Sequence, residues 1–90
     1  MSEPHRGRRA AIRAIYAELD APDWAAPNLD GLADVLRDLS WLPAGPVRVT
    51  WPPRPHVNVE DAGPILAVLR AAVAETAGGT RPVTLHFTPR

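Results

Sequence analysis

The chain has 90 residues, of which 46% are hydrophobic and 22% charged, so it has room for one domain with a single modest core. It contains no cysteine, which excludes a disulfide framework and a thiolate metal site. No apolar run is long enough to cross a bilayer, and the basic segment 1–9 lacks the apolar stretch of a signal peptide. We therefore expect a single cytoplasmic domain over residues 1–90, with residues 1–7 as a flexible tail.

The formal net charge is zero, but the charges are unevenly distributed. Residues 1–13 carry a net charge of +3, and residues 42–90 carry +2. In residues 14–41, six acidic side chains against one arginine give a net charge of −5. The sequence predicts the functional surface in this acidic segment.

The first periodic segment predicts a helix over residues 8–19. One stripe of apolar residues recurs there at three- and four-residue spacing: Ala11, Ile12, Ile15, Tyr16 and Leu19. The helix should end before Pro22, because the residue preceding a proline is pushed out of the helical region.

A second helix should begin after Asn28, which is a favourable N-cap, with Asp30 in the first turn. It should end near Ser40. Its buried face is predicted to consist of Leu29, Leu32, Val35, Leu36 and Leu39. Its other side should carry mainly charged residues, namely Asp30, Asp34, Arg37 and Asp38.

The last part of the chain predicts a strand, a helix and a strand. Val47–Trp51 alternates apolar and polar residues, residues 61–77 have helical periodicity, and Val83–Phe87 is a second strand pattern. Pro64 should lie in the first turn of the helix, and Gly78 should end it. A βαβ unit has parallel strands and a right-handed crossover. The class is therefore α/β, with a parallel sheet of two to three strands against three to four helices.

Residues 21–24, Ala-Pro-Asp-Trp, are followed at residues 28–36 by Asn-Leu-Asp-Gly-Leu-Ala-Asp-Val-Leu. This pattern resembles the hallmark of the barstar family, and the similarity extends through residues 46–51 and 64–87. The resemblance implies a barstar-like fold. It also implies a one-to-one protein inhibitor of a small secreted microbial ribonuclease of the guanyl-specific type.

The resemblance also implies roles for individual residues. Asp34 matches the aspartate that enters the phosphate-binding pocket of the ribonuclease, and Asp30 matches a second contact carboxylate. Trp24 matches a loop aromatic that packs on the enzyme. Asn28 and Leu29 match contact positions at the start of the helix.

Some positions depart from the family pattern. The family often has an aromatic residue where this chain has Ala33, and a Tyr-Gly-x loop in place of residues 25–27. A late-helix glutamate that contacts the enzyme is replaced by Ala71, and we expect Glu75, one turn later, to supply part of that interaction. Asp38 is predicted to be a rim charge.

The physical chemistry of the acidic helix agrees with these roles. A ribonuclease cleft binds a polyanion and is therefore basic. Asp30 and Asp34 are four residues apart, which places their Cβ atoms roughly 5–6 Å from each other on one helix face. Such a pair can take the places of substrate phosphates and accept charge-assisted hydrogen bonds. The negative charge should also accelerate association and make it sensitive to salt.

Other interpretations stay open. Asp30 and Asp34 are also compatible with a solvated helix face, and Trp24 with either the interface or the core. We expect Trp41 and Trp51 to be packing residues, the first at the junction of helix and loop and the second at the end of a strand. The chain could be a barstar-fold module for a different protein, such as another toxin or a regulator. An enzyme that uses the two aspartates as acid and base is disfavoured, because pocket-forming glycines and a nucleophile are missing.

The remaining polar residues predict neither a cofactor nor a metal. His5, His56 and His86 are scattered, without a second ligand at metal-binding spacing. The arginines of residues 6–13 lack interleaved aromatics, so we expect no nucleic-acid binding. We also expect no membrane association.

The family begins with a strand, but residues 1–7 have a proline and few β-formers. The first strand is therefore predicted to be missing or short. An exposed sheet edge favours self-association. We expect a monomer, with self-association through this edge as the alternative.

Overall fold

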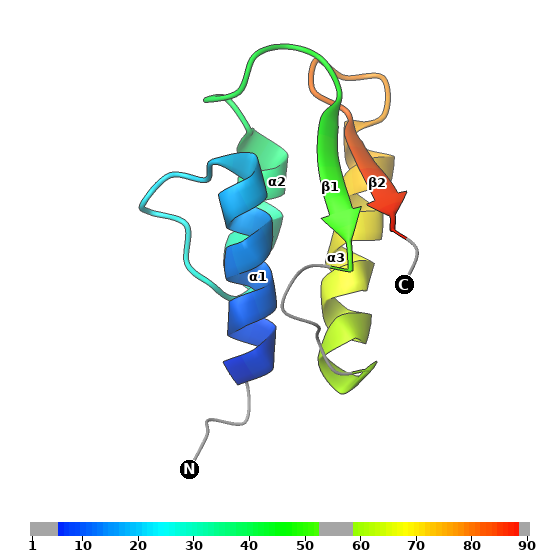
Figure 1. The fold of residues 1–90 in the computed structure, drawn as a ribbon. Coiled ribbons are helices and arrows are strands. Elements are labelled where there is room, and N and C mark those ends of the chain that lie inside the picture. Colours follow the sequence, from blue (N-terminus) through cyan, green and yellow to red (C-terminus); the bar gives the residue numbers. More distant parts are fainter. Residues whose placement is uncertain (1–5, 53–58, 89–90) are drawn as a thin grey trace.

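The computed structural model describes residues 6–52 and 59–88 (Figure 1). Within them the chain forms three helices and two strands: α1 (Arg6–Leu19), α2 (Leu29–Asp38), β1 (Val47–Trp51), α3 (Val59–Thr76) and β2 (Val83–Phe87). The predicted flexible tail, residues 1–7, lies outside the described residues except at its end. There the prediction was wrong, because Arg6 and Gly7 already belong to α1.

The two strands form a parallel sheet, with Val47 opposite Val83 and Trp51 opposite Phe87. Both strands have the predicted bounds, and the α/β class with a small parallel sheet is confirmed. Figure 1 shows α3 behind the sheet, with α1 and α2 beside it. α1 contacts both β1 and α3, and α2 contacts α3, so the helices and the sheet close around one core.

The core is built from the apolar stripes that the sequence predicts. All five residues of the predicted stripe of α1 are buried, and the fully buried large side chains come from every helix and both strands: Ile12, Ile15, Leu32, Val35, Leu36, Leu39, Val49, Ile65, Leu69 and Val83. Trp51 is also buried, as expected for the last residue of an alternating strand. This packing determines which face of α2 is exposed to solvent.

α2 ends at Asp38, two residues before the predicted end. Leu39 caps it in the left-handed conformation, with φ 51°, and its N–H donates to the carbonyl oxygen of Val35 at 3.2 Å. A leucine in this conformation costs about 1–3 kcal/mol. The side chain of Leu39 is 1% exposed. Burial of a leucine contributes about 1.5–3 kcal/mol, and so offsets that cost.

α3 begins at Val59, two residues before the predicted start. The prediction that Pro64 lies in the first helical turn was therefore wrong, because it is the sixth residue of the helix. A proline at this position of a helix has no N–H to donate to the carbonyl oxygen four residues earlier. Packing of Ile65 and Leu69 in the core, where both are fully buried, holds this part of the chain in the helix.

The outer edge of β1 is covered by a side chain of α1. The carboxylate of Glu18 accepts the backbone N–H of Thr50 at 2.8 Å and the Thr50 hydroxyl at 2.6 Å. Strand residues point their N–H groups alternately to the two sides, so this N–H faces away from β2. Glu18 thus satisfies a donor that a neighbouring strand would otherwise pair.

Candidate protein-interaction site

The acidic helix α2 begins where the sequence predicts. Asn28 is its N-cap, in an extended conformation, and its Oδ1 accepts the backbone N–H of Gly31 at 2.7 Å. Asp30 lies in the first turn and Arg37 in the last, so both charges complement the helix dipole. The start and direction of α2 are therefore fixed by local interactions.

The two faces of α2 differ sharply in burial. Leu32, Val35 and Leu36 are buried in the core, whereas the predicted site residues Asp30, Asp34 and Asp38 are exposed. Leu29, which was predicted on the buried face, is only partly buried against the core, because it is the first residue of the helix. The three carboxylates recur every four residues and so form a row along one side of the helix.

Within this row, Asp34 already has a partner. Nη2 of Arg37 donates to Oδ1 of Asp34 at 2.8 Å, and the two side chains are 61% and 62% exposed. An exposed pair of this kind contributes only about 0.2–1 kcal/mol. Asp34 can therefore exchange Arg37 for another cation at a small cost in free energy.

Tyr16 of α1 connects the loop before α2 to the acidic helix. Its hydroxyl donates to the carbonyl oxygen of Ala26 at 2.6 Å, and Gly31 of α2 packs against the same carbonyl. Burial, and secondarily the negative charge of Asp34, raises the pKa of Tyr16 to about 12. The hydroxyl consequently remains a donor at physiological pH and holds the loop in place.

The loop carries an aromatic pair. Trp24 is 57% exposed, so the core interpretation of this residue was wrong. Its ring meets that of Trp41 edge to face, with 6.1 Å between the ring centroids. Trp41 is partly buried, and its Nε1 donates to the carbonyl oxygen of Leu19 at 3.0 Å. Trp41 thus supports an aromatic side chain that faces solvent.

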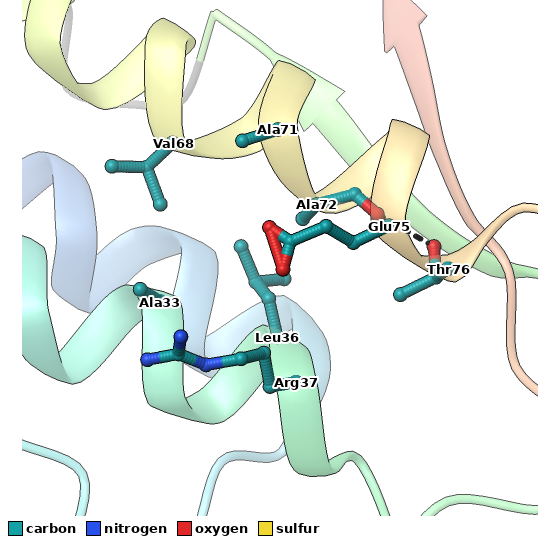
Figure 2. A pocket seen from close by; sticks show the side chains of 8 residues that line it. All are labelled: Ala33, Leu36, Arg37, Val68, Ala71, Ala72, Glu75 and Thr76. Atoms are coloured by element: carbon teal, nitrogen blue, oxygen red, sulfur yellow. Dashed lines mark hydrogen bonds between the residues drawn. The ribbon is translucent and has the colours of Figure 1, made fainter.

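Glu75, on α3, lies across a groove from α2. Figure 2 shows its carboxylate turned toward α2, above Leu36. The groove has a volume of about 110 Å³, and its other lining residues are mostly small or apolar: Ala33, Arg37, Val68, Ala71, Ala72 and Thr76. Two of them, Ala33 and Ala71, are the positions that depart from the family pattern.

The predicted residues thus fall into three structural features. These are the carboxylate row of α2, the aromatic pair before it, and the groove that contains Glu75. Sequence reasoning missed the contribution of Tyr16 and of Trp41 to the site. The only signal for either residue was its polar group in an otherwise apolar pattern, since a buried hydroxyl or indole N–H requires an acceptor.

The described residues give no indication of a metal centre or a membrane span. No group of three potential metal ligands occurs in residues 6–52 and 59–88. Across the same residues, none of the helices has the length and apolar character that crossing a membrane requires.

The fold and the site together define a small α/β protein with an acidic helix face open to contact with another molecule. The model of the family described as barstar (barnase inhibitor) matches residues 3–88. The chain belongs to the barstar family. The match covers nearly the whole chain. The family is described as an inhibitor of the ribonuclease barnase, so its described role is inhibition and not catalysis. Comparison with curated proteins and with solved structures gives no match.

Proposed function

We propose that this protein is a one-to-one inhibitor of a small secreted microbial ribonuclease of the guanyl-specific type. The observation that carries the proposal is the exposed carboxylate row of α2 in a chain of the barstar family. The carboxylates would occupy the phosphate-binding places of the ribonuclease cleft and exclude RNA from it. Residues 1–90 would act as one domain, and no cofactor is required.

In this proposal Asp34 is the principal contact and Asp30 supports it from the preceding turn. Trp24 adds an aromatic contact of low conformational cost, since its ring is already held by Trp41 at 6.1 Å. Asn28 and Leu29 contact the enzyme at the start of α2. Their positions are set by the N-cap, so little ordering would be required on binding.

Asp38 and Glu75 belong to the periphery of the proposed interface. Asp38 lies one turn beyond Asp34, and its exposed charge would contribute to attraction at a distance more than to the bound state. Glu75 approaches from α3 and extends the acidic surface beyond α2. A ribonuclease that contacts both helices would bury both groups at the rim.

The charge of residues 14–41 supports a basic partner. This segment holds a net charge of −5, and it includes α2 and the loop before it. Such a field accelerates the encounter with a basic cleft, and salt weakens the effect because it screens exposed charges. An inhibitor of this kind would protect the producing cell before the ribonuclease is exported, which places it in the cytoplasm.

Alanine substitution of Asp34 tests the proposal. Asp34→Ala should weaken binding to the ribonuclease by several kcal/mol, within the range of interface hot spots of about 2–8 kcal/mol. Asp38→Ala, on the same exposed side of α2, is the matched control and should cost less than about 1 kcal/mol. Inhibition titrations and circular dichroism on both variants would separate lost binding from lost folding. Equal, near-wild-type affinity of both variants would contradict the assigned roles.

The second candidate is a barstar-fold module for a different protein partner. The groove beside Ala33 and Ala71 favours it, because these two alanines stand where the family pattern has an aromatic residue and a glutamate. Capture of a basic protein other than a ribonuclease from the native lysate, together with no inhibition of any ribonuclease tested, would support this candidate.

A further inference from the structure

The face of the sheet that is turned away from α3 carries polar side chains. Neighbouring residues of a strand point to opposite faces, so burial of Val47, Val49 and Val83 turns the alternate residues of both strands to this second face. These alternate residues are Arg48, Thr50, Thr84 and His86. Among the described elements, no helix lies in front of this face in Figure 1, and the side chains of Arg48 and His86 are exposed.

Both ring nitrogens of His86 take part in contacts on this face. Nη2 of Arg48 lies 3.3 Å from Nδ1 of His86, and Oγ1 of Thr84 lies 3.2 Å from Nε2. A guanidinium can only donate, so Nδ1 must be the acceptor. The Thr84 hydroxyl donates its hydrogen to the carbonyl oxygen of Val47 at 3.3 Å, so it must accept from Nε2. The two contacts therefore specify the same neutral imidazole, with its proton on Nε2.

Two basic side chains are thus in contact without an acidic side chain that pairs with them. Across residues 6–52 and 59–88, neither an ion pair nor a hydrogen bond joins Arg48 or His86 to a carboxylate. Glu18 of α1 reaches this side of β1, but its two oxygens accept the N–H and the hydroxyl of Thr50, at 2.8 and 2.6 Å. While His86 is neutral, the charges of Arg48 and Glu18 cancel. A proton on His86 leaves one positive charge in excess.

We propose that Arg48 and His86 form a binding site for a small oxyanion, of the sulfate or phosphate type, which fills when His86 is protonated. A second proton on the imidazole removes the acceptor of Arg48 and places two cationic donors side by side. One oxyanion accepts from Nδ1 of His86 and from the guanidinium, whose planar fork suits anionic oxygens. Thr84 still accepts from Nε2 and so keeps the ring in position. Histidine side chains change charge between about pH 5 and 8, so mild acidification fills the site.

The surroundings favour a free oxyanion over the phosphate of a nucleotide. Recognition of an unpaired base usually requires an aromatic side chain or a guanidinium on which the base stacks. Trp51 and Phe87, the aromatic residues of the two strands, point to the opposite face of the sheet, and Arg48 is engaged by the oxyanion itself. The site also lies outside the carboxylate row of α2, which packs on α3, so the proposal does not depend on the inhibition of a ribonuclease.

NMR titration of the whole protein with sodium sulfate tests the proposal. Sodium chloride at the same ionic strength is the reference, because it screens charges equally. Sulfate keeps both negative charges over this pH range, so a pH dependence reports on the protein. At about pH 5.5 sulfate should shift the ring signals of His86 and the amide signal of Arg48 to saturation, with a dissociation constant of about 1–10 mM. At about pH 8 the binding should be about fivefold weaker or more.

Three variants show whether the site is the one proposed. Arg48→Gln and His86→Gln should each abolish the saturable shifts at the lower pH. Arg70→Gln removes the same charge as Arg48→Gln from an exposed position of α3 and should bind sulfate like the wild type. Wild-type sulfate affinity in Arg48→Gln, equal affinity at both pH values, or shifts that chloride reproduces would each overturn the proposal. A nucleoside monophosphate that binds more tightly than inorganic phosphate would overturn the assignment to a free oxyanion.

Discussion

Gly31 is a position in the site where the structure leaves no room for a side chain. An added Cβ would overlap the carbonyl oxygen of Ala26, and it would lie 3.0 Å from the carbonyl carbon and 3.1 Å from the Tyr16 hydroxyl. The nearest atoms belong to the backbone, so they cannot rotate away as the end of a flexible side chain would. Gly31→Ala should therefore displace the loop around Ala26 and break its hydrogen bond with Tyr16.

The expected cost follows from three contributions. Alanine is favoured over glycine inside a helix by about 1 kcal/mol. Overpacking of a tight contact costs about 1–3 kcal/mol. Loss of the hydrogen bond between Tyr16 and Ala26 costs about 1 kcal/mol more. We expect Gly31→Ala to lower the free energy of unfolding by about 1–3 kcal/mol in total.

Urea unfolding measures this change, and the chain offers a matched control. Ala67 lies at an exposed position inside α3, so Ala67→Gly measures the helix preference of alanine over glycine without a close contact. Ala67→Gly should lower the free energy of unfolding by about 1 kcal/mol. A Gly31→Ala variant as stable as the wild type, or one that gains the stability that Ala67→Gly loses, would refute the close contact between α2 and the loop.

Three further predictions concern the residues that support the site. The contribution of Tyr16 to the free energy of unfolding should be constant below pH ~10 and fall, by at most roughly 2–3 kcal/mol, as the pH rises from there through about 12, because the unfolded chain loses the tyrosine proton first. Tyr16→Phe should abolish the fall in stability above pH ~10, which can be measured because the chain has one tyrosine and no cysteine or lysine. Glu18→Ala should cost about 1 kcal/mol in urea unfolding by leaving the N–H of Thr50 unpaired, and Glu18→Gln should restore most of it; equal stability of both variants would contradict the role of the carboxylate. Trp41→Ala should weaken ribonuclease binding by about 1 kcal/mol through the loss of support for Trp24, and unchanged affinity in the titration would exclude that support.

Much of the fold could be predicted because its signals are local. The alternation in Val47–Trp51 and Val83–Phe87 sets both strands, and the N-cap Asn28 sets the start of α2. The errors lie at helix ends that depend on tertiary packing. Leu39 ends α2 in a left-handed conformation that burial supports, and the core contacts of Ile65 extend α3 across a proline.

Some features of the candidate site could likewise be predicted from the sequence, and others could not. The exposed position of Asp30 and Asp34 follows from their spacing opposite a leucine stripe, so sequence alone predicts it. The contact between Tyr16 and Ala26, ten residues apart, depends on how α1 packs against the following loop. The groove lies between two helices separated by a strand, and no sequence pattern specifies the distance between them. Interactions within one element and the parallel pairing of a βαβ unit are therefore predictable, whereas side-chain contacts between other elements are not.

The most direct test of the proposed inhibition is a titration of barnase and other small microbial ribonucleases with the purified protein. RNA cleavage would be followed at low and at high salt. We predict that at least one ribonuclease is inhibited with one-to-one stoichiometry, and that salt weakens the inhibition because the interface is charged. Full cleavage activity across the panel at low salt, with the protein in excess, would contradict the proposed function.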